Sequence, residues 1–504
     1  MARPRTSPER GAQAHGSKPM RSTGRGARCR GGLIAGLLAA AGMGVAGCAR
    51  LSPDGGMLVV EAAASAELGK EVKKIAHEAD AAALSARVRA LLAKPLTVSA
   101  AVQIALFNNR ALQAAFNELG ISDAEVAEAS LPPSPTLSWQ RIVGSGGFEI
   151  ERQIVQNVLA LLTLPRRREI AEARFQQAQA RAVATTLGVS LEAARAYYGA
   201  VAANEAVKAL EEARLSAESV SEVAKQLGET GAMSKLDQAR EHAFYAEVSA
   251  QLASARLRQR RERERLIRAL GLWDGDTKFT LPATLAALPN KPRTRAAVEQ
   301  DAVRRRADLV VSRLEVDILA LQLGLTRKTR VINALEVAGV SKTEKDIDPA
   351  TGEADKIKRR GFEVELEIPI YDFGEARLKR AEETYMAAVN RLLARAVNAR
   401  SEAREAYEVY RGAYDIARHY EREVLPLRRI IAEETLLNYN AMIRDLFALL
   451  AEARARIAAN MQAIEARRDF WLAAVDLEAA IVGGRGPQGA PPASTPSSTE
   501  PRDH

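Results

Sequence analysis

The side chains that most often carry out chemistry are scattered along this chain of 504 residues. None of the patterns HExxH, CxxC, GxSxG or the P-loop occurs in it. The many acidic residues stand in alanine-rich stretches, where they usually form solvated helix faces or pairs at i and i+4. We therefore expect no enzymatic activity, no metal and no cofactor. The histidines are far apart, at His15, His77, His242, His419 and His504.

The formal net charge of +9 is concentrated at the N-terminus. Residues 1–47 contain eight cations and one anion, Glu9, so the rest of the chain carries a net charge of only +2. The sequence therefore does not indicate a nucleic-acid partner. Apolar residues make up 47% of the chain, which excludes a disordered protein, and two cysteines are too few for a disulfide framework.

One of the two cysteines follows a short apolar segment. Residues 21–30 are basic, and residues 31–46 are apolar but too short for a confident membrane span. The segment ends in Val45-Ala46-Gly47-Cys48, which resembles the lipobox of bacterial lipoproteins. We predict that residues 1–47 are a signal peptide and that Cys48 is acylated, for example with palmitate. Ala49, rather than Asp, favours passage to the outer membrane. The alternative is cleavage elsewhere, with Cys48 incidental.

Two pairs of alternating segments lie in the two halves of the chain. Residues 136–142 and 148–154 form the first pair, and residues 330–337 and 362–368 form the second. Apolar and polar residues alternate in them with a period of two, which is typical of strands. We expect residues 341–360 to form a polar loop. Each half is thus predicted to hold one β-hairpin of about membrane-crossing length.

Long helices are predicted after each hairpin, over residues 166–227 and 232–270 and again from residue 375 to 438, with a kink at Pro426. Gly231 and Asn440 stand in the turns between the helices and tolerate a left-handed conformation. An apolar stripe in the last helix, which ends near Ile481, predicts helix packing. The stripe consists of Leu446, Leu450, Ala453, Ile457, Met461 and Ile464.

The predicted fold is mainly α-helical with a small β part and an internal two-fold repeat. Four strands cannot close a barrel in a membrane, where the smallest barrels have eight and open edges are not tolerated. The chain must therefore oligomerise if the hairpins cross a membrane, and three copies would share a 12-stranded β-barrel above an α-barrel of long helices. The expected segments are the signal peptide 1–47, an anchored segment 48–95, repeats 96–272 and 295–482, a linker 273–294 and a disordered tail 483–504.

Several segments, in their order, resemble the TolC-type outer-membrane efflux family and its lipid-anchored branch. They are the helix motif 96–109, the transition 129–132, the strand-to-helix return 369–374, the helix turn 231–237 and the closing helix 470–477. Asn440 departs from the family, since glycine is common there. The return at residues 164–167 also departs, because it lacks the usual glycine. The resemblance implies a homotrimer that acts as a passive exit duct and docks a periplasmic adaptor protein and an inner-membrane pump.

The same resemblance assigns the two helix turns to the periplasmic tip. We predict that they contact the adaptor; the alternative is that they only cap two helix hairpins. Arg444 and Asp445 are expected to form the periplasmic gate, or else an ordinary surface pair. The predicted adaptor contacts are Gly231, Ala232, Met233, Ser234, Asn440, Ala441, Met442 and Ile443.

A basic cluster precedes the fourth predicted strand. It consists of Lys356, Lys358, Arg359 and Arg360. These residues either form a solvated loop or meet lipopolysaccharide phosphates.

Two other functions compete with the duct. A non-conducting, lipid-anchored coiled-coil scaffold would not need amphipathic strands, and an adaptor would need β-rich domains between the helices.

Overall fold

The computed structural model describes residues 51–144, 147–294, 298–347, 354–441, 443 and 446–483. The description below concerns the unit that comprises residues 50–504. The predicted signal peptide and the segment 484–504 of the predicted tail lie outside the described residues.

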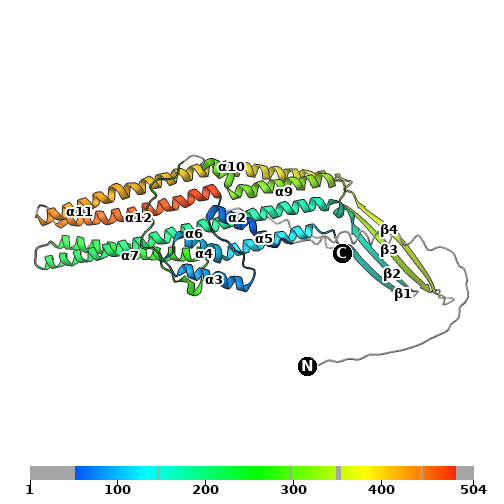
Figure 1. Ribbon diagram of the computed structural model, residues 1–504, viewed down its shortest axis with the longest axis horizontal. Helices are drawn as coiled ribbons and strands as arrows, with labels where there is room; N and C mark the ends of the chain where they lie inside the picture. The colour runs from blue at the N-terminus through cyan, green and yellow to red at the C-terminus, as the bar shows by residue number, and fades with distance from the viewer. Residues whose placement is uncertain are drawn as a thin grey trace, which may run out of the picture. The chain divides into compact units, whose positions relative to one another are not determined.

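The described part is mainly helical and contains one four-stranded sheet, as predicted (Figure 1). Within this unit the sheet lies at one end of the long helices, and the turns that join them in pairs lie at the other. The helices are α2 (Met57–Leu68), α3 (Glu78–Leu92), α4 (Val98–Asn108), α5 (Arg110–Ala129), α6 (Val158–Glu229), α7 (Lys235–Leu270), α8 (Val298–Arg305), α9 (Ala307–Thr329), α10 (Glu375–His419), α11 (Leu425–Asn440) and α12 (Leu446–Val482).

The sheet joins the two predicted hairpins. Its strands are β1 (Thr136–Gly144), β2 (Gly147–Asn157), β3 (Ala334–Ile347) and β4 (Ala354–Glu367), all antiparallel and in the order β1-β2-β3-β4. The hairpins pair through β2 and β3, from Gly147 opposite Asp346 to Asn157 opposite Glu336. Strands β1 and β4 are therefore the two edges.

The second hairpin is longer than predicted. Residues 341–347 and 354–360, expected as a loop, continue β3 and β4. Both faces of the hairpin are polar here, so the alternation that marks a half-buried strand is missing although the backbone pairing continues. The expectation that Lys356, Lys358, Arg359 and Arg360 precede the fourth strand is therefore wrong, because all four lie within β4.

Helix α6 has 72 residues, which corresponds to about 108 Å at about 1.5 Å per residue. The sequence predicts a start after Pro165, at residue 166, but the helix begins before Pro165, at Val158. Asn157 explains the earlier start, because its side-chain oxygen accepts a hydrogen bond from the Ala160 amide at 2.7 Å and so caps the first turn.

At Pro426, where the sequence predicts a kink, the helical hydrogen-bond pattern changes. A π-helical turn over Tyr420–Val424 separates α10 from α11, and the Leu425 amide donates to the Tyr420 carbonyl, five residues earlier. Proline has no amide proton to give to the carbonyl of Arg422, four residues before it. The wider turn next to the proline accommodates this missing bond.

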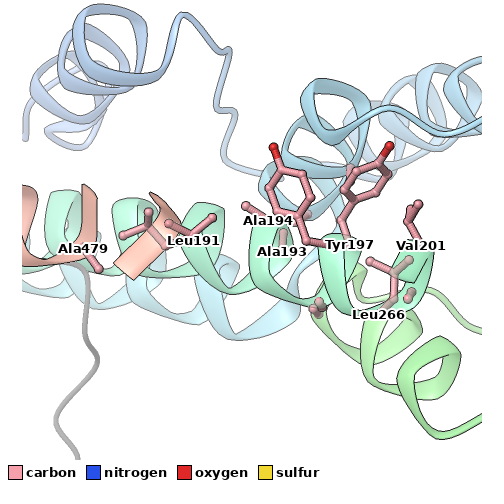
Figure 2. Packing of buried hydrophobic residues seen from close by; sticks show 14 of the residues in the cluster. Leu191, Ala193, Ala194, Tyr197, Val201, Leu266 and Ala479 are labelled. Atoms are coloured by element: carbon pink, nitrogen blue, oxygen red, sulfur yellow. The ribbon is translucent and has the colours of Figure 1, made fainter. Parts of the chain in front are cut away.

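The core forms where α6 packs against neighbouring helices. Figure 2 shows Leu191, Tyr197 and Val201 of α6 together with Leu266 of α7 and Ala479 of α12. Many other buried positions on α6 are alanines, which allow the helix backbones to approach closely. The predicted stripe of α12 also packs against α6 and α7: Ile457 contacts the cluster around Ala213, Ala217 and Val248, and Met461 contacts the cluster around Val207, Leu210 and Leu252.

The segment between the two halves is irregular, as predicted, apart from a 3₁₀ turn over Asp274–Thr277. It is fastened to helices of both halves by hydrogen bonds. The Leu285 amide donates to Glu205 of α6 at 2.7 Å, and the Tyr414 hydroxyl of α10 donates to the Pro289 carbonyl at 3.0 Å. The segment therefore links the two helix sets at mid-length.

Candidate functional site

The two faces of the sheet differ in chemistry. Side chains directly opposite each other on paired strands point to the same face, so the register assigns each residue to one face. We call the first the apolar face, because exposed Leu137, Trp139 and Phe362 lie on it. Its apolar residues are Leu137, Trp139, Val143, Phe148, Ile150, Ile154, Leu335, Val337, Phe362, Val364 and Leu366.

Every charged residue of the apolar face is a cation, among the described residues. These cations are confined to the three rows of paired residues nearest the hairpin turns. The three rows nearest the helices carry no charge; one of them contains Leu137, Ile154, Gly339 and Phe362. We call the cations the basic zone: Arg141, Arg152, Lys345, Lys356, Lys358 and Arg360.

The opposite face is predominantly acidic, and we call it the acidic face. Lys342 and Arg359 are its only cations among the described strand residues, and Lys342 pairs with Glu149 at 2.5 Å. Arg359 therefore points away from its neighbours Lys358 and Arg360. The acidic residues whose side chains are described are Glu149, Glu151, Glu336, Glu344, Asp355, Glu363, Glu365 and Glu367.

Exposed apolar side chains continue beyond the end of β4. Ile368 and Ile370 are exposed, and Tyr371 is 98% exposed. Gly374 is the N-cap of α10 and has φ of 73°, and a Cβ there would overlap the Arg330 carbonyl. Only glycine both adopts a positive φ easily and leaves room for the Arg330 carbonyl, which explains the glycine of the strand-to-helix return.

The first helix turn has the predicted left-handed glycine. Gly231 has φ of 75°, and the Ala232 amide donates to the Leu227 carbonyl at 2.8 Å, closing α6. Ser234 is the N-cap of α7, since its side chain accepts from the Asp237 amide at 3.2 Å. Helix α7 thus begins at Lys235 and not at Ala232. Gly231, Ala232 and Ser234 are exposed, and Met233 is half-buried.

The second turn differs from the expectation at Asn440. This residue is the last of α11 and is not left-handed, because the described residues with positive φ other than glycine are Asp274 and Phe373. The Ala441 amide donates to the Leu437 carbonyl at 3.0 Å, and the Ile443 amide donates to that of Asn438 at 2.9 Å. Ile443 is 71% exposed. The predicted site residues Met442, Arg444, Asp445 and Cys48 lie outside the described residues.

Close to the turns, buried carboxylates join the helices. Glu241 of α7 is 3% exposed and accepts from Arg454 of α12, and Glu452 of α12 accepts from Arg428 of α11 at 3.0 Å. Neither pair is predicted from the sequence. Glu241 and Arg454 are 213 residues apart, so no local spacing signals their contact.

The described residues contain no group of three or more His, Cys, Asp or Glu side chains that could hold a metal ion. A cavity of about 460 Å³ lies between α6, α7 and α12. Alanines and larger apolar residues line most of it, and its polar residues are Gln251, Ser254, Arg258, Glu465 and Arg468. No helix in the described part of the chain is both long enough and apolar enough to cross a membrane.

No protein-family profile and no curated protein matches this chain. Solved structures do match it. The outer-membrane channel OprN superposes with a TM-score of 0.62 at 17% identity, covering 77% of this chain and 90% of OprN. The CmeC outer membrane channel of Campylobacter jejuni gives 0.62 at 18%, covering 77% and 86%. VceC, an outer membrane protein of Vibrio cholerae, gives 0.61 at 14%, covering 77% and 96%. The chain thus has the TolC-type fold of these outer-membrane channels.

Proposed function

We propose that this chain is one third of a trimeric outer-membrane channel, the passive exit duct of a tripartite efflux system. The observation that carries the proposal is the four-stranded sheet, which has two unpaired edge strands and faces of opposite character. In lipid, unpaired edge amides and carbonyls are costly, so such a sheet needs partner strands from other chains. Twelve strands from three copies satisfy both edges of every copy.

The two faces of the sheet support one orientation of the strands in this proposal. The apolar face turns to lipid, and the acidic face turns to the lumen. The strand ends that join α6, α9 and α10 lie on the periplasmic side, and the hairpin turns lie outside the cell. The long helices then extend the lumen into the periplasm.

The turns at the far end of the helices are the proposed docking surface for a periplasmic adaptor, which in turn connects the duct to an inner-membrane pump. Ala232, Ser234, Ala441 and Ile443 support this role because they are exposed and lack long charged side chains. We further propose that Met442 belongs to this surface, that Arg444 and Asp445 form the gate, and that acylated Cys48 anchors the chain to the outer membrane.

Conductance tests the proposal directly. The purified full-length protein should have the mass of a trimer by native mass spectrometry and should form channels in planar lipid bilayers. A folded protein that never conducts would instead favour the non-conducting coiled-coil scaffold. For the anchor, Cys48→Ser should abolish incorporation of labelled palmitate, and an unmodified mature N-terminus in the native protein would contradict the lipobox.

A further inference from the structure

Within the described part of the chain, the basic zone lacks a paired counter-charge. None of its six cations forms an ion pair with another described residue. Lys345 stands directly opposite Lys356 on the neighbouring strand, an arrangement that is destabilising without an anion. Arg141 and Lys345 approach the ring of Phe148, at 5.6 and 6.0 Å from its centroid, and this is the contact they make within the sheet.

The position of the basic zone relative to the apolar residues indicates its surroundings. Ile368 is the exposed apolar residue just beyond the helix-proximal end of β4, and Lys358 lies ten residues away along the chain. At about 3.3 Å per residue and a tilt of about 40°, these residues are about 25 Å apart along the membrane normal. That distance equals the height of the apolar band of a membrane barrel. Lys358 therefore lies at the outer headgroup level.

We propose that the basic zone binds the phosphates of a phosphorylated glycolipid in the outer leaflet of the membrane. This inference rests on the proposed function, because it needs the apolar face to meet lipid. Arg360 lies just below the boundary and reaches it with its long side chain, while Lys358 and Lys356 lie at and above it. Guanidinium groups bind phosphate oxygens in pairs, and ammonium groups bind them as point charges.

The size of the basic zone favours a headgroup with two phosphates over a single phosphate. Arg360 and Lys356 are four residues apart on β4, which is about 13 Å along the strand. Four strands at about 4.8 Å spacing extend the zone by about 14 Å in the other direction, from Arg141 on β1 to Lys358 on β4. One phosphate contacts only part of such an area.

A pair of double variants tests the proposal. In K358Q/R360Q two cations of the apolar face are lost, and in K342Q/R359Q two cations of the same hairpin are lost from the acidic face. Each purified full-length trimer is titrated with a bis-phosphorylated glycolipid of the lipid A type, and bound lipid is counted by native mass spectrometry. We expect K358Q/R360Q to lower the affinity roughly tenfold and K342Q/R359Q to leave it unchanged.

Equal affinities for all three proteins, or equal losses in both variants, would overturn the inference. Phosphatidylglycerol binding as tightly as the glycolipid, or inorganic phosphate displacing it at equal concentration, would overturn the choice of ligand. If K358Q/R360Q does not assemble, Lys356→Gln, next to the turn, replaces it with the same expected direction. A wild-type trimer that conducts but does not retain the glycolipid refutes this site alone, whereas one that retains it without conducting refutes the channel alone.

Discussion

Arg454 of α12 donates to both carboxylate oxygens of Glu241 on α7, each at 3.3 Å, and so joins the two helix hairpins near their turns. The guanidinium carbon lies 4.4 Å from the centroid of the Phe244 ring on the same helix as Glu241. The arginine is thus held between a buried carboxylate and an aromatic face. This side chain therefore adds a polar contact to the apolar packing of Ile457 and Met461 between the hairpins.

The first prediction is that Arg454→Met loosens this contact. Glu241 would remain buried without its partner, whose own side chain is 40% exposed, and leaving one buried polar group unsatisfied costs about 1–3 kcal/mol. Amide hydrogen exchange should therefore accelerate in the facing parts of α7 and α12. Arg258→Met removes a half-exposed pair with Glu465, so it should cost less than about 1 kcal/mol. The double variant Glu241→Leu/Arg454→Met should recover most of the protection from hydrogen exchange. Equal exchange in all variants would contradict this role of the Glu241–Arg454 pair.

The second prediction concerns alkaline pH. Burial, and next the charge of neighbouring Tyr197, raise the pKa of Tyr198 to about 12 from an ordinary value of 10.0. The unfolded chain loses this proton first, so the stability contributed by protonated Tyr198 is complete below pH 10 and is lost as the pH rises to about 12. Tyr198 also stacks on Trp471, with ring centroids 5.0 Å apart, so phenylalanine should preserve the packing.

Thermal melts followed by circular dichroism between pH 10 and 12 measure this effect. The melting temperature of the wild type should fall more steeply with pH than that of Tyr198→Phe. Tyr439→Phe is the control. The Tyr439 side chain is exposed near the second turn, so the loss of its hydroxyl group should leave the slope unchanged. Parallel curves for all three proteins would show that Tyr198 ionisation is not linked to unfolding.

The sequence predicts the elements of this fold better than it predicts their ends and contacts. Period-two alternation identifies the strands where one face is apolar, and it fails at Thr343 and Lys358, where both faces are polar. Pro426 marks an irregularity of the helix that can be predicted, because its missing amide acts locally. The left-handed conformation predicted at Asn440 is wrong, because a residue that tolerates this conformation need not adopt it. The pairing of Glu241 with Arg454 depends on tertiary packing and has no local sequence signal.

The third prediction is ion selectivity. If the acidic face lines the lumen, its carboxylates attract cations, and the reconstituted channel should pass K⁺ in preference to Cl⁻. Glu363→Gln combined with Glu365→Gln should reduce that preference. Lys358→Gln, on the apolar face of the same strand, should leave it unchanged. Reversal potentials under a KCl gradient measure the effect, and an anion-selective wild type would contradict the assignment of the faces.

The fourth prediction is closure of the sheet between copies. Edge strand β1 of one copy should pair with edge strand β4 of the next, and cysteines on the same face of both edges should then form disulfides. Ser138→Cys is combined in turn with Gly361→Cys, Glu363→Cys or Glu365→Cys, all on the acidic face.

One of these combinations should give covalent dimers and trimers, and no larger species, on non-reducing gels. The single-cysteine variants are the controls, because each supplies only one edge and should not link β1 to β4. Monomers in every combination, from protein that is folded in membranes, would refute the shared barrel. A ladder longer than trimers would indicate an open assembly instead.

The last prediction concerns docking at the helix turns. Ala232 and Ala441 are exposed, one in each turn, and small side chains allow another helix to approach closely. In Ala232→Glu or Ala441→Glu a carboxylate would be desolvated without a partner on docking, at a cost of about 2 kcal/mol or more. Efflux and crosslinking to the adaptor should both fall, while the trimer remains intact.

Ala253→Glu, exposed midway along α7 and about 27 Å from its start, is the matched control. It introduces the same charge on an exposed helix position and should leave adaptor crosslinking normal. Normal efflux and crosslinking in both turn variants would exclude the turns as the docking surface and direct attention to the grooves between the helices.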